Sequence, residues 1–349
     1  MRSIRWPRPT VGALTAATLL AWCAASPVGA WAAGPTLANW DQVQQRAVWH
    51  AGLMGNFGRW FAGASPLSEG QANSAMAALS ARLASAGAGK VAAVRTSQTP
   101  VTVTTFDAMV VDQLGLRSVA AHVQAAAAAA GLTPPSYFGT EVVARFLGFR
   151  YDHPAGTDQL ELYPYNPITR AEAAWTLARV MNFASTGDVP YAQQTLSSFR
   201  LPKMSAHQIG ALQVAISRIG YPYVYAGTTD DTSDGLAHGG FDCSGLVWRV
   251  FRLSGLQWGS KIAGRTAAQM AGEIPRSQRL RMNQLQSGDI LFFGTAHFTS
   301  AATESDITHT GIYLGDNWVI HASRQGVSVD QLSGGWLGDS FTWGRRVVS

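Results

Sequence analysis

The chain has very little cysteine and little charge. Only two cysteines, Cys23 and Cys243, occur among 349 residues, and charged side chains make up 13% of the sequence. With 47% hydrophobic residues, this composition excludes a largely disordered chain and is sufficient for at least one full core, and the length indicates two domains. No cluster of Lys and Arg with interleaved aromatic residues is present, so we expect no nucleic-acid partner.

The first 32 residues have the order of a secretory signal peptide. A basic start with Arg2, Arg5 and Arg8 precedes the apolar run VGALTAATLLAWCAASPVGA and the small-residue cluster AWAAGP. We predict a cleaved signal at 1–32 and a secreted or cell-wall protein with no membrane span left after cleavage. The alternative is an uncleaved anchor, which the proline and glycine inside the run disfavour.

Cleavage would leave Cys243 as the single cysteine. Because bulky Trp22 precedes Cys23, a lipid-modified cysteine there is disfavoured, and Cys23 leaves with the signal. Three arginines and no acidic residue leave with it, so the formal net charge falls from +5 to +2. This mild positive charge is compatible with an anionic cell-wall polymer as partner. In an oxidising compartment, a leftover thiol is buried and inert, paired between chains, or reactive.

Residues 33–199 are predicted to form an all-α repeat domain. Three alanine-rich amphipathic segments, GQANSAMAALSARLASA, VAAHVQAAAAAAGL and ITRAEAAWTLARVMNFA, predict helices. The stretches SPLSEGQANSAMAALSARL and NPITRAEAAWTLARVM share the order Pro, apolar residue, Ser or Thr, helix, and VTVTTFDAMVVDQLGL is a weaker third copy. We expect Thr169 to cap its helix, with Glu172 completing a capping box.

The clearest unit of this repeat, ITRAEAAWTLARVM, resembles the S-layer homology domain, whose short helical repeats bind cell-wall polysaccharide. The resemblance implies that Arg170, in the TRAE motif, contacts an anionic secondary cell-wall polymer. The first copy carries Glu69 in that place, and the middle copy carries Thr105 or Phe106. From the residues alone, the alternative is a helical packing module whose capping box only stabilises a helix.

After a predicted linker at 200–206, the pattern changes to α+β at 207–349. One helical segment, AHQIGALQVAISRIG, is followed by glycine-rich turns and the strand-like runs DILFFG, HTGIYLG, WVIHAS and RRVVS. Helices that precede a run of strands predict an antiparallel sheet with helices packed against it.

The stretch FDCSGLVWRVF reads as a loop that enters a helix at Cys243. Leucine, valine and phenylalanine recur after it at spacings of three and four, which predicts a core-facing stripe. Asp242 or Ser244 can cap the helix start. A thiol in the first helical turn lies at the positive end of the helix dipole, so we expect a lowered pKa for Cys243, provided that the Asp242 carboxylate turns away from the sulfur.

Two histidines in the strand-like runs are candidates for the base that such a thiol needs. His309 opens HTGIYLG, and His321 closes WVIHAS after the turn GDN, so a hairpin would bring both imidazoles to one end. One can then pair with Cys243 while the other orients it. The alternatives are a packed cysteine and a zinc set of Cys, His and His. We favour thiol catalysis and predict no metal and no cofactor.

Five blocks in this order, GYPYVYAG, FDCSGLVWRVF, LQSGDILFF, HTGIYLGDNWVIHAS and RRVV, resemble the NlpC/P60 family of papain-like cell-wall cysteine peptidases. The resemblance implies a papain-like fold with Cys243 as the nucleophile, His309 as the base and His321 as the residue that orients this base. It also implies that Tyr223 contacts the surroundings of the nucleophile.

The resemblance further implies a peptidoglycan endopeptidase that cuts stem peptides, commonly between γ-D-glutamate and a diamino acid. We assign Asp242 and Ser244, with Tyr223, to substrate binding. Two long loops, 228–240 and 295–306, would border the cleft. The alternatives are a non-catalytic wall-anchoring protein, and acyl transfer or amidase chemistry on another γ-linked polymer.

Overall fold

A computed structural model describes most of the chain after the predicted signal. The described residues are 40–55, 61–85, 97–154, 156–298 and 302–348. The predicted signal peptide and Cys23 lie outside these residues. No helix within these ranges is both long and apolar enough to span a membrane.

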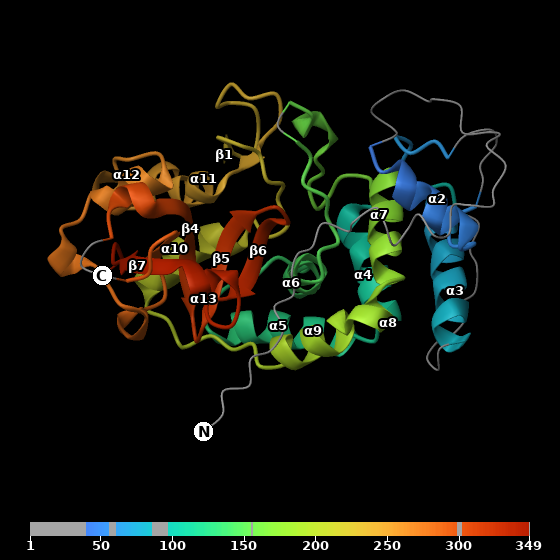
Figure 1. Cartoon of the computed structure of the whole chain (residues 1–349), viewed down its shortest axis with the longest axis horizontal. Helices are drawn as coiled ribbons and strands as arrows, with labels where there is room; N and C mark the ends of the chain where they lie inside the picture. Colours follow the sequence, from blue (N-terminus) through green and yellow to red (C-terminus); the bar gives the residue numbers. More distant parts are fainter. Residues whose placement is uncertain (1–39, 56–60, 86–96, 155, 299–301, 349) are drawn as a thin grey trace.

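The first half of the described chain is helical, as the sequence predicts (Figure 1). The alanine-rich segments form helices because their small and apolar residues recur at helical spacing; α3 and α5 bury one side, whereas α7 is buried almost all round. The helices are α2 (Gln42–His50), α3 (Glu69–Ser85), α4 (Val103–Gln113), α5 (Arg117–Ala129), α6 (Phe138–Phe146), α7 (Arg170–Val180), α8 (Phe183–Thr186) and α9 (Asp188–Leu196).

The three copies of the repeat meet in a closed ring of backbone hydrogen bonds just before α3, α4 and α7. The N–H of Leu67 donates to the Ile168 carbonyl at 2.8 Å, the N–H of Ile168 donates to Val101 at 2.9 Å, and the N–H of Val101 donates to Leu67 at 3.0 Å. In each copy the next residue caps its helix through a side-chain oxygen; these residues are Ser68, Thr102 and Thr169. The weak middle copy is therefore a structural equivalent of the other two.

This register corrects two details of the sequence interpretation. Thr102 and Thr169 occupy equivalent cap positions, so Val103, and neither Thr105 nor Phe106, stands where Arg170 stands in the third copy. Thr169 accepts the backbone N–H of Glu172 at 3.2 Å, as predicted. The reciprocal half of the capping box is replaced, because the Glu172 carboxylate bonds the Nε2 atom of His153 at 2.9 Å.

Arg170 is buried, with 2% of its surface exposed. Its Nε donates to the Phe61 carbonyl at 2.7 Å, and its guanidinium lies 4.8 Å from the centroid of the Phe61 ring. The predicted contact with a wall polymer requires an exposed guanidinium, so the structure does not present Arg170 for that role.

The second half contains a five-stranded antiparallel sheet in the order β6-β5-β4-β3-β7, which confirms the α+β class. The strands are β3 (Ile290–Gly294), β4 (Ile307–Gly315), β5 (Trp318–Ser323), β6 (Gly326–Gln331) and β7 (Phe341–Arg345). The strand expected at RRVVS lies earlier in the sequence: it is β7, which begins at Phe341 and ends at Arg345. β6 is an addition that the sequence interpretation lacked.

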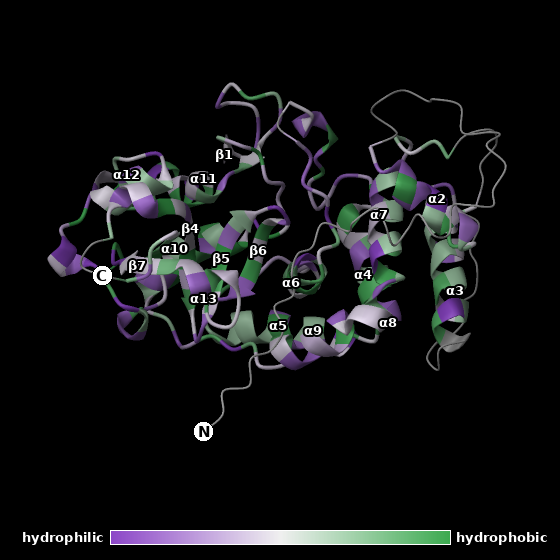
Figure 2. Cartoon of the chain, in the orientation of Figure 1, coloured by the Kyte–Doolittle hydropathy of each residue, from purple (hydrophilic) through white to green (hydrophobic). Residues whose placement is uncertain are grey.

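Helices cover both faces of this sheet. Alternate residues of β3 divide between two apolar clusters: Ile290 and Phe292 belong to the main core, whereas Leu291 and Phe293 pack with Leu337 of a short helix on the opposite face. The helices are α10 (Ala206–Ile216), α11 (Cys243–Trp248) and α12 (Ala267–Gly272), of which α11 and α12 pack on β4, and α13 (Trp336–Ser340), which supplies Leu337. Figure 2 shows that hydrophobic residues recur along both the helices and the strands.

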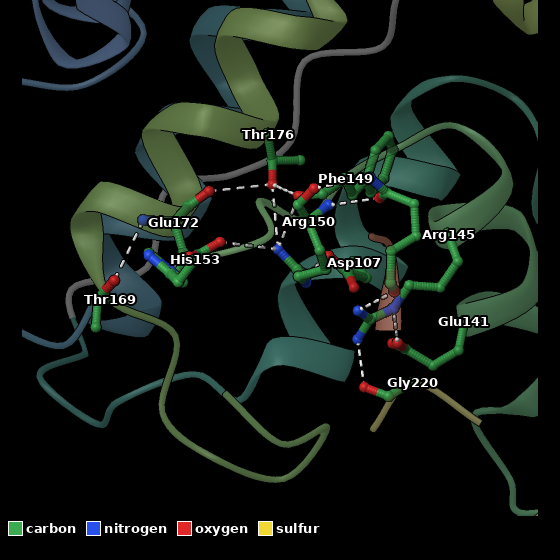
Figure 3. Close-up of polar contacts among 11 residues, drawn as sticks. Asp107, Glu141, Arg145, Phe149, Arg150, His153, Thr169, Glu172, Thr176 and Gly220 are labelled. Atoms are coloured by element: carbon green, nitrogen blue, oxygen red, sulfur yellow. Dashed lines mark hydrogen bonds and ion pairs between the residues drawn. The ribbon is translucent and has the colours of Figure 1, made fainter. Parts of the chain in front are cut away.

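The main core runs without interruption from the helical half into the sheet half, and α6 packs against β6. Arg145, 3% exposed, donates through its side chain to the Gly220 carbonyl at 2.6 Å (Figure 3). It also donates to the Gln325 carbonyl at 2.7 Å. The Gln325 side chain in turn accepts from the backbone N–H of Arg150 at 3.1 Å and donates to its carbonyl at 3.0 Å. The helical half is thus bonded directly to the turn between β5 and β6.

The predicted domain limits, 33–199, 200–206 and 207–349, remain predictions. The segment after α9 holds Phe199, which is fully buried and packs 4.9 Å from the ring of Trp318 in β5. The predicted linker then leads into α10.

Candidate active site

Cys243 is the first residue of α11, as predicted. Asp242 is the N-cap, and its carboxylate accepts the backbone N–H of Gly245. A Cβ at Gly245 would lie 1.8 Å from the Gly227 carbonyl oxygen, so only glycine fits this position. The predicted apolar stripe is fully buried and anchors the helix; its members are Leu246, Val247, Val250 and Phe251.

The Cys243 sulfur lies where α11 meets the sheet. α11 packs against β4, and the backbone N–H groups of Thr310 in β4 and of Ser244 in the first helical turn both act to lower the pKa of the Cys243 thiol. Since Thr310 directly follows His309, the fold brings the candidate nucleophile to the strand that carries the candidate base.

The expected lowering of the thiol pKa is wrong. Burial raises the pKa of Cys243 to about 11, and the neighbouring Asp242 carboxylate raises it further. The N–H groups of Thr310 and Ser244 and the charge of Arg265 act in the opposite direction without offsetting this rise. The resting site therefore holds a protonated thiol at neutral pH, because removal of water outweighs the first-turn dipole.

The predicted hairpin brings the two histidines together. β4 and β5 pair in antiparallel register with Ile312 opposite Ile320, and the connecting residues Asp316 and Asn317 both have positive φ angles, 44° and 75°. The Nε2 atom of His309 and the Nδ1 atom of His321 are 2.8 Å apart.

Asp330 is the third member of this series of hydrogen-bonded side chains, and the sequence analysis missed it. The Nε2 atom of His321 lies 2.8 Å from Oδ2 of Asp330, on β6. The Ser328 hydroxyl lies 3.3 Å from the same oxygen. The signal was present in GVSVDQ, where valines alternate with polar residues as in a half-buried strand, directly after the turn that closes β5.

His309 is held as a neutral imidazole. Burial, followed by the charge of His321, lowers its pKa well below the usual range. The Trp336 ring of α13 packs against both histidines, with centroids 5.0 Å from His309 and 5.8 Å from His321, while 52% of its own surface stays exposed. The histidine pair therefore lies beneath an aromatic cover at the surface.

Arg265 is a second residue that sequence reasoning missed. Its Nη1 lies 3.1 Å from Oδ1 of Asp242 and 2.8 Å from the Ser244 hydroxyl, and its Nη2 lies 3.1 Å from Oδ2 of Asp242 and 2.8 Å from the Ala226 carbonyl. Asp242 and Ser244 are mostly buried, 8% and 5% exposed. Both predicted substrate-binding residues thus take part in the frame that surrounds the thiol.

Tyr223 lies near Cys243, the candidate nucleophile. It forms a parallel bridge with Phe241, two residues before Cys243. Burial, and next the charge of Cys243, raise the pKa of its hydroxyl. Neighbouring Tyr225 is 71% exposed, whereas Tyr221 packs edge-on against Tyr163 at 5.2 Å.

The first long loop is fixed by the helical half. It starts and ends at the short strands β1 (Thr228–Thr229) and β2 (Gly240–Phe241). His238 stacks on Tyr163 at 5.2 Å, and the Tyr163 hydroxyl donates to the Asp230 carbonyl at 2.7 Å. In the second long loop, His297 is exposed, and part of that loop lies outside the described residues.

Comparison with known proteins relates the part of the chain that carries this site to a protein family. Residues 220–346 match the model of the NlpC/P60 family, a span that includes every residue of the site above. The C-terminal part of this chain therefore carries an NlpC/P60 domain.

Curated relatives match a part of the chain. The chain is 34% identical over 118 residues to the probable endopeptidase Rv2190c of Mycobacterium tuberculosis, covering 34% of this chain and 24% of the relative. It is 30% identical over 135 residues to the bifunctional muramidase/DL-endopeptidase CwlT of Bacillus subtilis, 38% and 35% of the two chains. It is 31% identical over 147 residues to the gamma-DL-glutamyl hydrolase of Bacillus subtilis, 40% and 29%. The chain thus matches between 24% and 35% of the length of these three relatives.

Proposed function

We propose that the NlpC/P60 domain of this chain is a cysteine endopeptidase of peptidoglycan stem peptides, which cuts between γ-D-glutamate and a diamino acid. One observation carries the proposal: α11, which begins at Cys243, packs on the strand that carries His309, and Nε2 of His309 lies 2.8 Å from Nδ1 of His321. The endopeptidase and DL-endopeptidase names of the relatives support this substrate class.

The first step uses His309 as a general base. Because its Nε2 is engaged with His321, its Nδ1 is the nitrogen that takes the thiol proton. The raised pKa of Cys243 and the lowered pKa of His309 mean that this proton moves as the substrate is attacked and not beforehand. The sulfur adds to the scissile carbonyl, and backbone N–H groups at the start of α11 hold the oxyanion.

The second half of the reaction returns the site to its resting state. Protonated His309 gives its proton to the leaving amine as the C–N bond breaks, which leaves an acyl thioester on Cys243. His309 then takes a proton from water as the oxygen adds to the thioester carbonyl. The C–S bond breaks, and the sulfur recovers the proton from His309.

The test is cleavage of purified muropeptides by the full chain, with mass spectrometry of the products. Cys243→Ala and His309→Ala should abolish cleavage, because each removes an atom that takes part in bond making or proton transfer. His297→Ala, in an exposed loop, is the matched control and should retain activity. Full activity in either of the first two variants would overturn the mechanism.

A second candidate is cleavage of another γ-linked polymer, favoured by the relative named gamma-DL-glutamyl hydrolase. To distinguish the two substrates, poly-γ-glutamate and muropeptides are supplied together in one assay. At low enzyme concentration, only the preferred substrate is cleaved. The same spectra distinguish hydrolysis from acyl transfer, which joins the acyl group to an added amine instead of water.

We infer, in addition, that the helical half attaches the enzyme to the cell wall as an S-layer-homology-like module. The ring of hydrogen bonds among its three copies supports a repeat origin. Because Arg170 is buried, attachment must use other, exposed residues. Co-sedimentation of Cys243→Ala with cell-wall sacculi, before and after removal of their secondary polymer, tests this; equal binding to both preparations would exclude the anionic polymer as the ligand.

A further inference from the structure

We propose that Asp330 is a positioning residue of this site: its carboxylate fixes which nitrogen of His321 carries the proton, and through His321 it leaves Nδ1 of His309 free to receive the thiol proton. The inference deepens the proposed function and rests on it. It extends the Cys243, His309 and His321 set by one member that comes from a different strand.

Hydrogen-bond chemistry gives the direction of each contact. A carboxylate only accepts, so the His321 Nε2 that lies 2.8 Å from Asp330 Oδ2 is the donor. A neutral imidazole has one N–H, and Nδ1 of His321 is therefore an acceptor. The nitrogen 2.8 Å away, Nε2 of His309, must then donate to it. The remaining lone pair of a neutral His309 lies on Nδ1, where a base is needed.

Burial makes this arrangement effective. His321 is fully buried, so water does not compete for either of its nitrogens. The Ser328 hydroxyl, opposite His321 in the ladder of β5 and β6, lies 3.3 Å from Asp330 Oδ2 and limits movement of the carboxylate. The charge of Asp330 also stabilises the imidazolium that forms when His309 takes the proton, which its buried position alone disfavours.

Other charged groups near the histidine pair are already engaged. On the α11 side, Cys243 is neutral at rest and Asp242 is paired with Arg265. On the α13 side the neighbour is Trp336, which carries no charge. Among the described residues, the carboxylate that contacts the pair is that of Asp330.

The experiment compares Asp330→Asn, Asp330→Glu and the control Asp316→Asn in the full chain. Asn has the same shape but can turn its amide N–H toward His321, which reverses the tautomer. We expect kcat for muropeptide cleavage to fall about 100-fold in Asp330→Asn with KM within about twofold of the original, and Asp330→Glu to recover part of the loss. Asp316→Asn, the same change in the turn between β4 and β5, should stay within about threefold, since Asp316 pairs with the exposed Arg200.

A second readout does not need the substrate. Imidazole nitrogen chemical shifts from histidine labelled with nitrogen-15 identify the protonated nitrogen of His321, which should be Nε2 in the original chain and should change in Asp330→Asn. An unchanged tautomer in a folded Asp330→Asn, or kcat within about threefold, would overturn the proposal. If the original chain cleaves no peptide, the proposed function fails while the shift measurement still decides the role of Asp330.

Discussion

The Arg265 guanidinium lies across the Asp242 carboxylate, with one nitrogen 3.1 Å from each carboxylate oxygen. Asp242 directly precedes Cys243 in the chain and raises the pKa of its thiol, whereas Arg265 lowers it. Asp242 also caps α11 through its carboxylate. Arg265 thus offsets part of the Asp242 charge beside a thiol that becomes an anion in the proposed mechanism.

Removal of Arg265 should therefore make the Cys243 thiol less reactive. In Arg265→Gln, the uncompensated Asp242 charge raises the pKa of Cys243 further, and we expect alkylation by iodoacetamide at pH 8 and peptide cleavage to fall about tenfold or more. Arg252→Gln is the control, because Arg252 lies over Trp248, away from Asp242. Equal alkylation rates in Arg265→Gln and the control would contradict this account.

The pH dependence of Cys243 reactivity is a separate prediction. With a thiol pKa of about 11, deprotonation rises as the pH rises, and the thiolate fraction is small at pH 7. In the free enzyme, alkylation should keep accelerating from pH 8 to above pH 10. A plateau already reached by pH 8 would show that the resting thiol is ionised.

Asp41 should make the helical half less stable at high pH. Burial raises its folded-state pKa from 3.8 to about 8, so the neutral form is favoured in the fold. Its contribution to stability is complete below pH 3.8 and is lost as the pH rises toward 8, on the order of 1 kcal/mol per pH unit. Asp41→Asn, which mimics the neutral acid, should reduce this loss between pH 5 and pH 8 in denaturant unfolding, whereas Asp112→Asn, at an exposed site, should not.

The turn between β5 and β6 should contribute measurably to the join between the two halves. Gln325→Ala removes two hydrogen bonds to the backbone of Arg150, and we expect a loss of about 1–2 kcal/mol in the free energy of unfolding. Arg324→Ala, next to it, removes only an exposed ion pair with Asp152 and should change stability by less than about 0.5 kcal/mol. Equal losses in the two variants would contradict a specific join at Gln325.

Local patterns accounted for much of the site. The apolar spacing after Cys243 predicted the start of α11, and two strand-like runs around a tight turn predicted the contact of His309 with His321. Both inferences depend on residues close together in sequence, for which periodicity and turn chemistry are informative.

Long-range packing decided the rest. Arg265 lies beyond α11 in the sequence, and no local pattern links it to Asp242. The alternating run GVSVDQ indicates a strand after β5, but only the pairing of β6 with β5 brings Asp330 to His321. The thiol pKa depends on how much water the surrounding elements exclude, which the helix position of Cys243 does not report. The burial of Arg170 likewise follows from a distant carbonyl, that of Phe61.

The ring formed by Leu67, Val101 and Ile168 sets a condition on how the helical half is made. Each residue both donates to one neighbour and accepts from the other, so the ring is complete only when all three are present. Its first and last members are about a hundred residues apart, and closing so long a loop has an entropic cost before any contact compensates it. During synthesis the first two copies leave the ribosome before the third, so the ring stays incomplete until the third copy has been made. In that interval the helical half is most exposed to proteolysis and misassembly.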